Sequence, residues 1–177
     1  MKLSMHDLET AERRDAVASL AVEDEDVANQ SPARLLITAP TQQGVENLAR
    51  RIHGAGRRAR FPFVQISAVE LPVGPELLKE YCARLLDTAA GGSLLVSAVE
   101  EMPAIVQDAM IDLLGGLESA RMPSDAARLI SGTTVSLLDR VAAGTFSERL
   151  FYRLNIIHLV VGNGSQPYSF GAPRRCI

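Results

Sequence analysis

The residues with the clearest potential for chemistry lie in one short loop between two patterned segments. Residues 35–53 read LLITAPTQQGVENLARRIH, an apolar run followed by a polar loop and then by apolar residues at helical spacing. A phosphate-binding loop occupies this kind of position, where glycines let backbone N–H groups curve around phosphate and a lysine reaches its oxygens. This loop has one glycine and no lysine, so alone it does not qualify. Its candidate cofactor-binding residues are Thr41, Gln42, Gln43, Gly44, Val45 and Glu46.

The other residue types that perform chemistry do not form a recognisable set. Cys82 and Cys176 lack the spacing of a zinc site or of a disulfide framework, and Cys82 is expected to be a small buried hydrophobe. His6 and His158 stand alone, and His53 is expected to pack or cap rather than catalyse. The sequence therefore predicts no metal site and no nucleophilic triad.

A cluster of arginines follows the loop, but it is typical of a solvated helix face. Its members are Arg50, Arg51, Arg57, Arg58 and Arg60. The whole chain has a formal net charge of −3 and a pI of about 5.6, so it lacks the basic footprint of a nucleic-acid-binding protein. The sequence predicts no direct contact with nucleic acid.

Alternating strands and helices are expected to position these residues. Short apolar runs predict strands at 33–38, 63–66, 93–98, 127–132 and 156–161. Helical spacing predicts helices at 44–55, 75–89, 103–117 and 136–143, and a helical turn at 146–154. Such alternation is typical of an α/β fold with a mostly parallel five-stranded sheet, in which ligands bind at the carboxyl ends of the strands.

The composition agrees with a buried sheet covered by helices. Only 5% of the 177 residues are aromatic and none is Trp, so the core must consist of Ala, Leu, Val and Ile. We expect an acidic helical segment at 1–31, the α/β core at 32–161, and a loop or disordered tail at 162–177. No signal peptide or membrane-spanning run is visible, which favours a cytoplasmic protein without a membrane partner.

Three further runs carry a resemblance to a known family. They are LARRIHGAGRRARFPFVQISA at 48–68, GGSLLVSAVEEMPAIVQDAMIDLL at 91–114, and ARLISGTTVSLLDRVAAGTFSERLFYRLNIIHL at 127–159. In this order they resemble the sigma-54 interaction domain of the bacterial enhancer-binding proteins, which are AAA+ ATPases. The resemblance implies a three-layer P-loop NTPase-like fold, the AAA+ core, over about residues 31–161.

The resemblance also shows which nucleotide-binding residues are replaced. The family's loop pattern is GExGxGKE, in which Gln42 stands for a glycine and Val45 for the lysine, while Gly44 and Glu46 are retained. Loss of a charge-assisted lysine–phosphate contact removes roughly 1.5–3 kcal/mol. A side chain at Gln42 is also expected to close the loop sterically, leaving helix N-terminal amides as a weak anion site.

The family's magnesium and water-polarising residues are replaced as well. The Asp-Glu pair at the end of the third strand corresponds to Ser97 and Ala98. Glu100 and Glu101 follow, either as surface acids that cap the next helix or, after a register shift, with Glu100 in the acidic position. The family's sensor asparagine corresponds to Thr134.

The arginine-finger segment is only partly retained. The first finger corresponds to Ser147, and the second matches Arg153. An arginine finger acts on the nucleotide of a neighbouring subunit. The alternative role for Arg153 is a structural or interface contact.

Two family segments are expected to be absent from this chain. Leu71 to Gly91 holds one predicted helix and nothing similar to the sigma-54-contacting GAFTGA sequence. A helical lid is also not expected after Val161.

The sequence thus predicts a regulatory domain without catalysis, a pseudo-ATPase that acts in transcription regulation through protein contacts. Its expected partner is a full-length homologous AAA+ activator or another copy of itself. The expected cofactor is none, or ATP with Mg²⁺ held weakly. The alternatives are a weak ATPase that completes its site with a neighbouring subunit, and a decayed fragment without selected activity.

Overall fold

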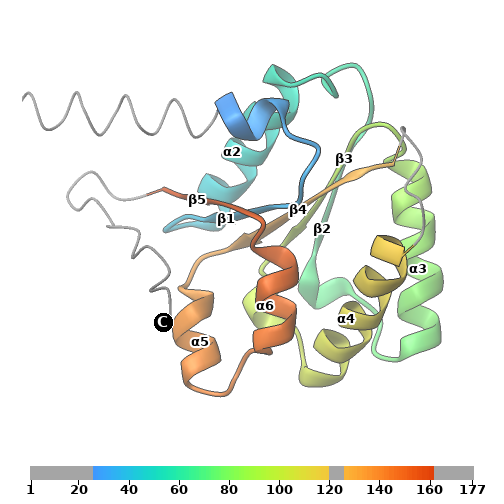
Figure 1. Cartoon of the computed structure of the whole chain (residues 1–177), viewed down its shortest axis with the longest axis vertical. Coiled ribbons are helices and arrows are strands. Elements are labelled where there is room, and N and C mark those ends of the chain that lie inside the picture. The colour runs from blue at the N-terminus through green and yellow to red at the C-terminus, as the bar shows by residue number, and fades with distance from the viewer. Residues whose placement is uncertain (1–25, 120–125, 162–177) are drawn as a thin grey trace, which may run out of the picture.

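A single parallel sheet forms the centre of the molecule. The structure, a computed structural model, describes residues 26–119 and 126–161. The sheet has the order β2-β3-β4-β1-β5, and all of its strand pairs are parallel (Figure 1). The strands are β1 (Leu35–Thr38), β2 (Phe63–Ser67), β3 (Ser93–Ser97), β4 (Arg128–Thr133) and β5 (Ile157–Val160). The five predicted strands are confirmed, each with ends within two residues of the prediction.

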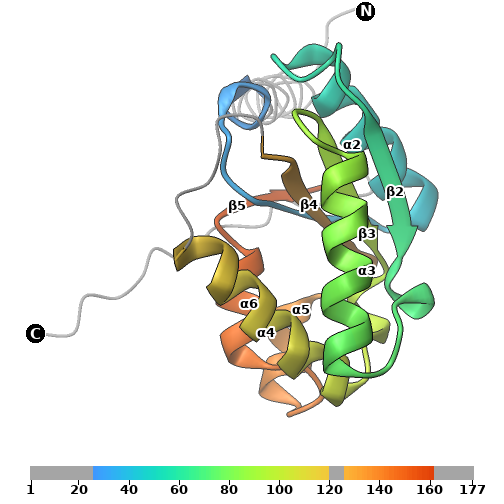
Figure 2. The ribbon, with the colours of Figure 1, turned by 90° about the vertical axis from the view of Figure 1, so that its right-hand side faces the viewer.

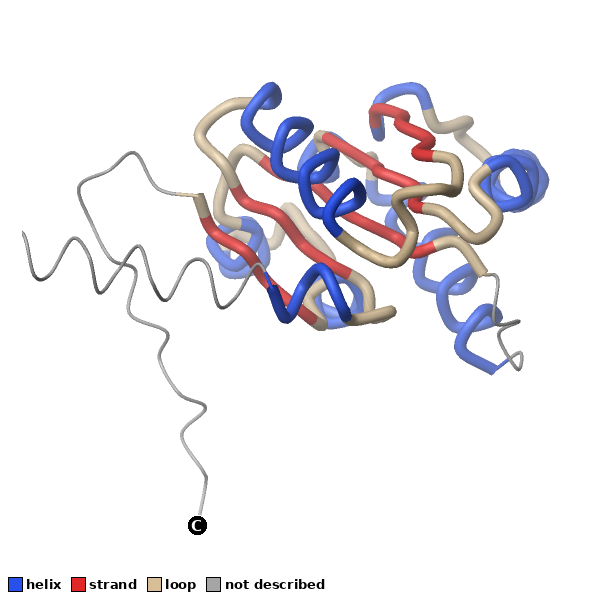
Figure 3. Tube along the Cα trace, turned by 90° about the horizontal axis from the view of Figure 1, so that it is seen from above, coloured by secondary structure: helices blue, strands red, loops and turns tan. Residues whose placement is uncertain are grey.

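Helices cover both faces of this sheet and give three layers. The helices are α2 (Gln42–Ala55), α3 (Pro75–Thr88), α4 (Ala104–Ser119), α5 (Leu137–Ala142) and α6 (Glu148–Leu154), with short 3₁₀ turns at η1 (Ala68–Glu70) and η2 (Val99–Glu101). Helix α2 lies on one side of the sheet, whereas α3 and α4 pack together on the other side, with α6 beside α4 (Figures 1 and 2). Viewed from above, the strands run between these two helical layers (Figure 3). The predicted α/β fold class is confirmed.

The strands are apolar along their whole length because both faces of the sheet are buried. Neighbouring residues on a strand point to opposite faces, so Leu36 and Ile37 enter two different cores. The core under α3, α4 and α6 includes Leu36, Val96 and Leu150. The core under α2 is smaller and includes Ile37 and Val45.

The segment from Leu71 to Gly91 contains a single helix, as predicted. Helix α3 begins with Pro75 in its first turn, where a missing N–H costs no hydrogen bond, and ends at Thr88. No other helix is present between β2 and β3 apart from the one-turn η1.

The expected terminal segments lie mostly outside the described residues. Residues 26–30 are helical, and the fully buried Ala28 belongs to the α2 core. The acidic stretch before residue 26 and the tail from 162 to 177 are not described. Among the helices of the described part, none is long and apolar enough to cross a membrane.

His158 makes the fold sensitive to mild acid. Its Nε2 lies 2.9 Å from the Thr38 hydroxyl, between two neighbouring strands, and burial lowers the pKa of its imidazole. The unfolded chain therefore takes up this proton first, at about pH 6.5, and the folded chain only at lower pH. This contribution to stability is complete above about pH 6.5 and declines as the pH falls below that value.

We expect His158→Gln to flatten the acid limb of the stability curve. The slope of unfolding free energy against pH between 6.5 and 5 should decrease by up to about 1.4 kcal/mol per pH unit, the effect of one proton. Urea unfolding at a series of pH values measures this slope. Above pH 7.5 the two proteins should have the same slope, and equal slopes below pH 6.5 would contradict the assignment.

Candidate nucleotide cleft

A polar cleft opens at the carboxyl ends of the strands, where α/β sheets bind their ligands. Its volume is about 620 Å³. The side chains around it are Gln42, Glu46, Arg50, Gln65, Ile66, Ser67, Glu70, Ser97, Ala98, Glu100, Glu101 and Thr134. The structure therefore brings residues of the loop, of the third strand's end and of the sensor position to one place. Four of the lining residues are glutamates and one is an arginine, so the cleft is acidic.

Most residues of the candidate phosphate loop form the first turn of helix α2. Helix α2 begins at Gln42, two residues before the predicted start, so only 39–41 separate it from β1. Thr41 caps the helix: its hydroxyl accepts from Gly44 N at 3.1 Å, and its carbonyl accepts from Val45 N at 3.1 Å. These two amides are consequently bonded within the chain and do not point at a ligand.

Val45 does not enter the cleft at the position of the family lysine. Its side chain is 0% exposed and packs in the α2 core. The partner that receives it is Gly132 on β4, because a Cβ atom built on Gly132 would collide with Val45 Cγ1. Valine at one position and glycine at the other thus form a matched pair.

Ser97 and Ala98, which the resemblance aligns with the Asp-Glu pair, both have structural roles at the end of β3. Ser97 is 2% exposed, and its hydroxyl donates to the Ile66 carbonyl of β2 at 3.2 Å. Ala98 follows in the left-handed region, with φ 54° and ψ 42°, and is the only non-glycine residue with positive φ in the described ranges. This turn ends β3 and directs the chain into η2.

Glu100 reaches across to the sensor position. Its Oε1 accepts from Thr134 N at 2.9 Å and from Thr134 Oγ1 at 2.7 Å. The prediction that Glu100 caps the following helix is therefore wrong. The left-handed turn at Ala98 sends its carboxylate toward the end of β4 instead. The second oxygen, Oε2, is buried without a hydrogen-bond partner, and Glu101 is exposed at the rim.

The residues of the finger segment make contacts within the chain. Ser147 caps α6 by accepting from Leu150 N, and its own N–H donates to Gln107 Oε1 at 2.7 Å. The Arg153 guanidinium lies beside α4, since a Cβ built on Gly115 would be 3.4 Å from its Nη2. Arg153 is half-buried in this position.

The structure also shows the surroundings of Cys82 and of two residues in the basic stretch, His53 and Arg58. Cys82 is buried, which confirms its role as a small hydrophobe. His53 packs its ring against Phe63 and contacts the Ser93 hydroxyl, as expected of a packing residue. Arg58 is not a solvated surface charge, because it donates to the carbonyls of Gly91 and Ala126.

Sequence reasoning missed the acidic character of the cleft and the role of Gly132. Glu70 lies in η1, more than twenty residues from the loop, and no local pattern links it to Glu46. Gly132 is more than eighty residues from Val45 in the sequence, so their contact becomes visible only when β4 packs under α2.

The strand order, the three layers and the cleft at the strand ends define the P-loop NTPase class of α/β proteins. The P-loop NTPase domain of the sigma-54 transport activator from E. coli has this fold, with a TM-score of 0.52 over 72% of this chain and 95% of that one, at 21% identity. NtrX from Brucella abortus, solved with ADP, gives a TM-score of 0.63 at 29% identity over 81% of this chain and 35% of that one.

Sequence comparison narrows this class to one family. A family model described as "Sigma-54 interaction domain" matches residues 15–163, and the chain belongs to that family. The regulatory protein AtoC of Escherichia coli is 32% identical over 74% of this chain and 32% of its own length. The transcriptional regulatory protein FlbD of Caulobacter vibrioides is 29% identical over 82% of this chain and 36% of its own. The chain thus spans about a third of the length of these relatives.

Proposed function

We propose that this chain is a sigma-54-activator-like regulatory domain that does not hydrolyse ATP and acts in transcription regulation through protein contacts. Its partner in this proposal is a homologous AAA+ activator subunit or a second copy of the chain. The observation that carries the proposal is the conversion of the phosphate loop into a capped helix start with Val45 in the core.

The first supporting argument concerns the phosphates. A phosphate-binding loop acts through free backbone N–H groups and a lysine. Here the N–H groups of Gly44 and Val45 are bonded to Thr41, and no lysine is present among the lining residues. The four glutamates of the cleft add repulsion toward a polyphosphate.

The second argument concerns the metal and the attacking water. Ser97 offers a neutral hydroxyl that is already donated to Ile66 O, so it supplies no carboxylate ligand for Mg²⁺. Glu100 is the first acid after Ser97 in the sequence, but one of its oxygens accepts hydrogen bonds from Thr134. NtrX from Brucella abortus has been solved with both ADP and ATP, so a relative of this fold does hold nucleotide.

Nucleotide binding and phosphate release test the catalytic half of the proposal. Isothermal titration with Mg-ATP should give no heat of binding, and phosphate release should stay at background. Val45→Lys should not restore either, because the loop amides remain capped by Thr41. A homologous activator with an intact GExGxGKE loop is the positive control.

A different outcome would favour the alternative of a weak ATPase completed by a neighbouring subunit. Turnover above background that rises with protein concentration and is lost in both Glu100→Gln and Arg153→Ala would overturn the proposal. Arg149→Ala, a change to an exposed arginine on the same helix, is the matched control for Arg153→Ala.

Mixing experiments test the protein-contact half. Addition of this chain to a homologous activator should lower the activator's ATPase rate per subunit, and sedimentation should show mixed assemblies. Absence of mixed assemblies and of self-association would leave the decayed-fragment alternative in its place.

A further inference from the structure

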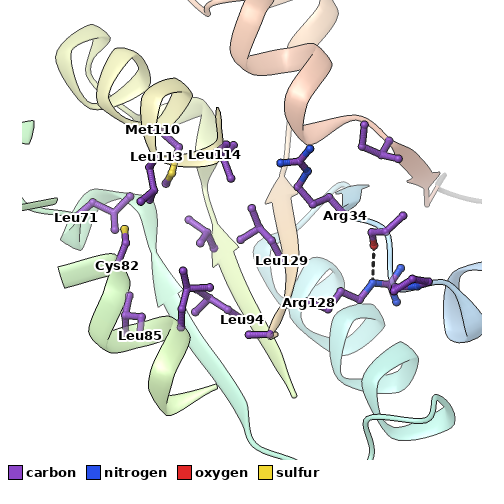
Figure 4. A pocket seen from close by; sticks show the side chains of 16 residues that line it. Arg34, Leu71, Cys82, Leu85, Leu94, Met110, Leu113, Leu114, Arg128 and Leu129 are labelled. Atoms are coloured by element: carbon purple, nitrogen blue, oxygen red, sulfur yellow. Dashed lines mark hydrogen bonds between the residues drawn. The ribbon is translucent and has the colours of Figure 1, made fainter. Parts of the chain in front are cut away.

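A second cavity lies on the other face of the sheet from α2. It sits between helices α3 and α4 and strands β3 and β4, and its volume is about 360 Å³ (Figure 4). Its apolar lining consists of Pro32, Ala33, Leu71, Cys82, Leu85, Leu86, Leu94, Val96, Met110, Leu113, Leu114, Ala127, Leu129 and Ile156. No residue of the nucleotide cleft contributes to it.

The cavity opens to solvent, so it is a surface pocket and not an interior packing void. Two of its lining residues, Pro32 and Ile156, are exposed, and Ile156 is 53% exposed. An engineered apolar cavity of about 150 Å³ stays dry and binds benzene. The cavity between α3 and α4 has more than twice that volume and falls in the size range of small-molecule sites, which begins at about 300 Å³.

The lining specifies the body of a ligand. Its apolar part is built from leucine, isoleucine, valine, methionine, alanine and proline side chains and from one thiol, with no aromatic side chain. A flexible aliphatic chain fits such a lining better than a flat ring, which gains from aromatic neighbours. By comparison with the benzene cavity, the volume suits a chain of about eight to twelve carbon atoms.

Two arginines in the lining indicate which polar group a ligand would carry. Arg34, the residue before β1, and Arg128, the first residue of β4, complete the lining. Figure 4 shows the Arg34 guanidinium reaching from the strand edge toward Leu114 on α4. Arg128 donates to the Ala33 carbonyl at 2.8 Å and to the Ala28 carbonyl at 2.6 Å. A guanidinium beside an apolar cavity favours a carboxylate, because its planar N–H groups match the two oxygens.

We propose that the cavity between α3 and α4 binds a medium-chain aliphatic carboxylate, with its chain among the leucines and its carboxylate at Arg34. This site is independent of the proposed function, since it shares no residue with the nucleotide cleft. A ligand there touches β3, which ends at Ser97, and the first residues of β4, which is followed by Thr134.

Cys82 provides a direct reporter of the cavity. It lines the cavity, and burial raises the pKa of its thiol to about 11, so its modification is slow. In a Cys176→Ser background, the rate of reaction with methyl methanethiosulfonate measures access to Cys82. We expect decanoate, below its micelle concentration, to slow this reaction at least tenfold, with one-to-one binding by isothermal titration.

Two pairs of variants separate this site from general surface binding. Leu85→Phe fills the cavity and should weaken decanoate binding at least tenfold, whereas Leu77→Phe, an exposed position on the same helix, should not. Arg34→Gln should weaken decanoate about tenfold and leave decanol unchanged. Arg84→Gln, an exposed arginine on α3, should change neither.

Measurements on the unsubstituted protein test the proposal even if a variant fails to fold. Absence of both binding heat and Cys82 protection at millimolar decanoate would overturn the proposal, and would mean that the chain's own residues or a protein partner fill the space. Equal effects of Leu85→Phe and Leu77→Phe would also overturn it, because they would indicate non-specific detergent-like binding.

Discussion

Gly132→Ala is expected to lower the free energy of unfolding by about 3 kcal/mol, a cost at the upper end for overpacking a core. The added methyl would collide with Cγ1 of Val45, which is fully buried and β-branched. A valine side chain on a helix has one strongly preferred rotamer, so it cannot swing aside. The sheet and α2 would have to move apart. Urea unfolding followed by circular dichroism measures the loss.

The matched pair is tested by a double-mutant cycle with Val45→Ala. That change alone should cost about 2 kcal/mol, because it deletes two buried methyl groups. In the double variant the new alanine methyl at position 132 occupies the space that the valine leaves. The combined loss should therefore be no greater than about 2 kcal/mol, with an interaction energy of at least about 3 kcal/mol. Additive losses would show that the two positions are not coupled.

Gly92→Ala should be more damaging still and should leave most of the chain unfolded. A Cβ at this position would collide with the Pro62 carbonyl oxygen and lie 2.8 Å from the Pro62 carbonyl carbon. These are backbone atoms at the start of β2, and Ser93 N donates to the same oxygen at 3.0 Å. We expect a loss above about 4 kcal/mol, comparable with the whole stability of a small domain.

A matched glycine in the same molecule provides the control. A Cβ at Gly54, in the last turn of α2, meets nothing within 4 Å. Gly54→Ala should therefore stabilise the helix by about 0.5–1 kcal/mol. Thermal unfolding and soluble yield compare the two variants. A Gly92→Ala protein that unfolds within a few degrees of the unsubstituted chain would contradict the packing argument.

The elements of the fold follow from local sequence to an unusual extent. Strands such as 93–97 are continuous apolar runs because both faces of a parallel sheet are buried, and this pattern is visible without a structure. Pro75 marks the start of α3, and Gly91-Gly92 separates it from β3. Each of these signals acts over a few residues, so a single sequence contains them.

The site was less predictable because its geometry depends on contacts between distant segments. The loop pattern placed the helix start at residue 44, but the Thr41 cap brings it forward to Gln42. The direction of Glu100 depends on the left-handed turn at Ala98 and on Thr134, which lies on another strand's end. The sequence shows that the loop contains no lysine, but only the packing of the structure shows where the Val45 side chain lies.

Because Val45 fills the space beside Gly132, the residue that is tolerated at one of these positions depends on the residue at the other. A lysine at position 45 would leave a hole beside Gly132 and a buried ammonium or an unanchored helix start. A lysine at position 45 therefore calls for a larger residue at position 132 as well, and Gln42 also departs from the glycine of the family pattern. Substitutions at positions 45 and 132 should consequently be tolerated in matched pairs rather than singly.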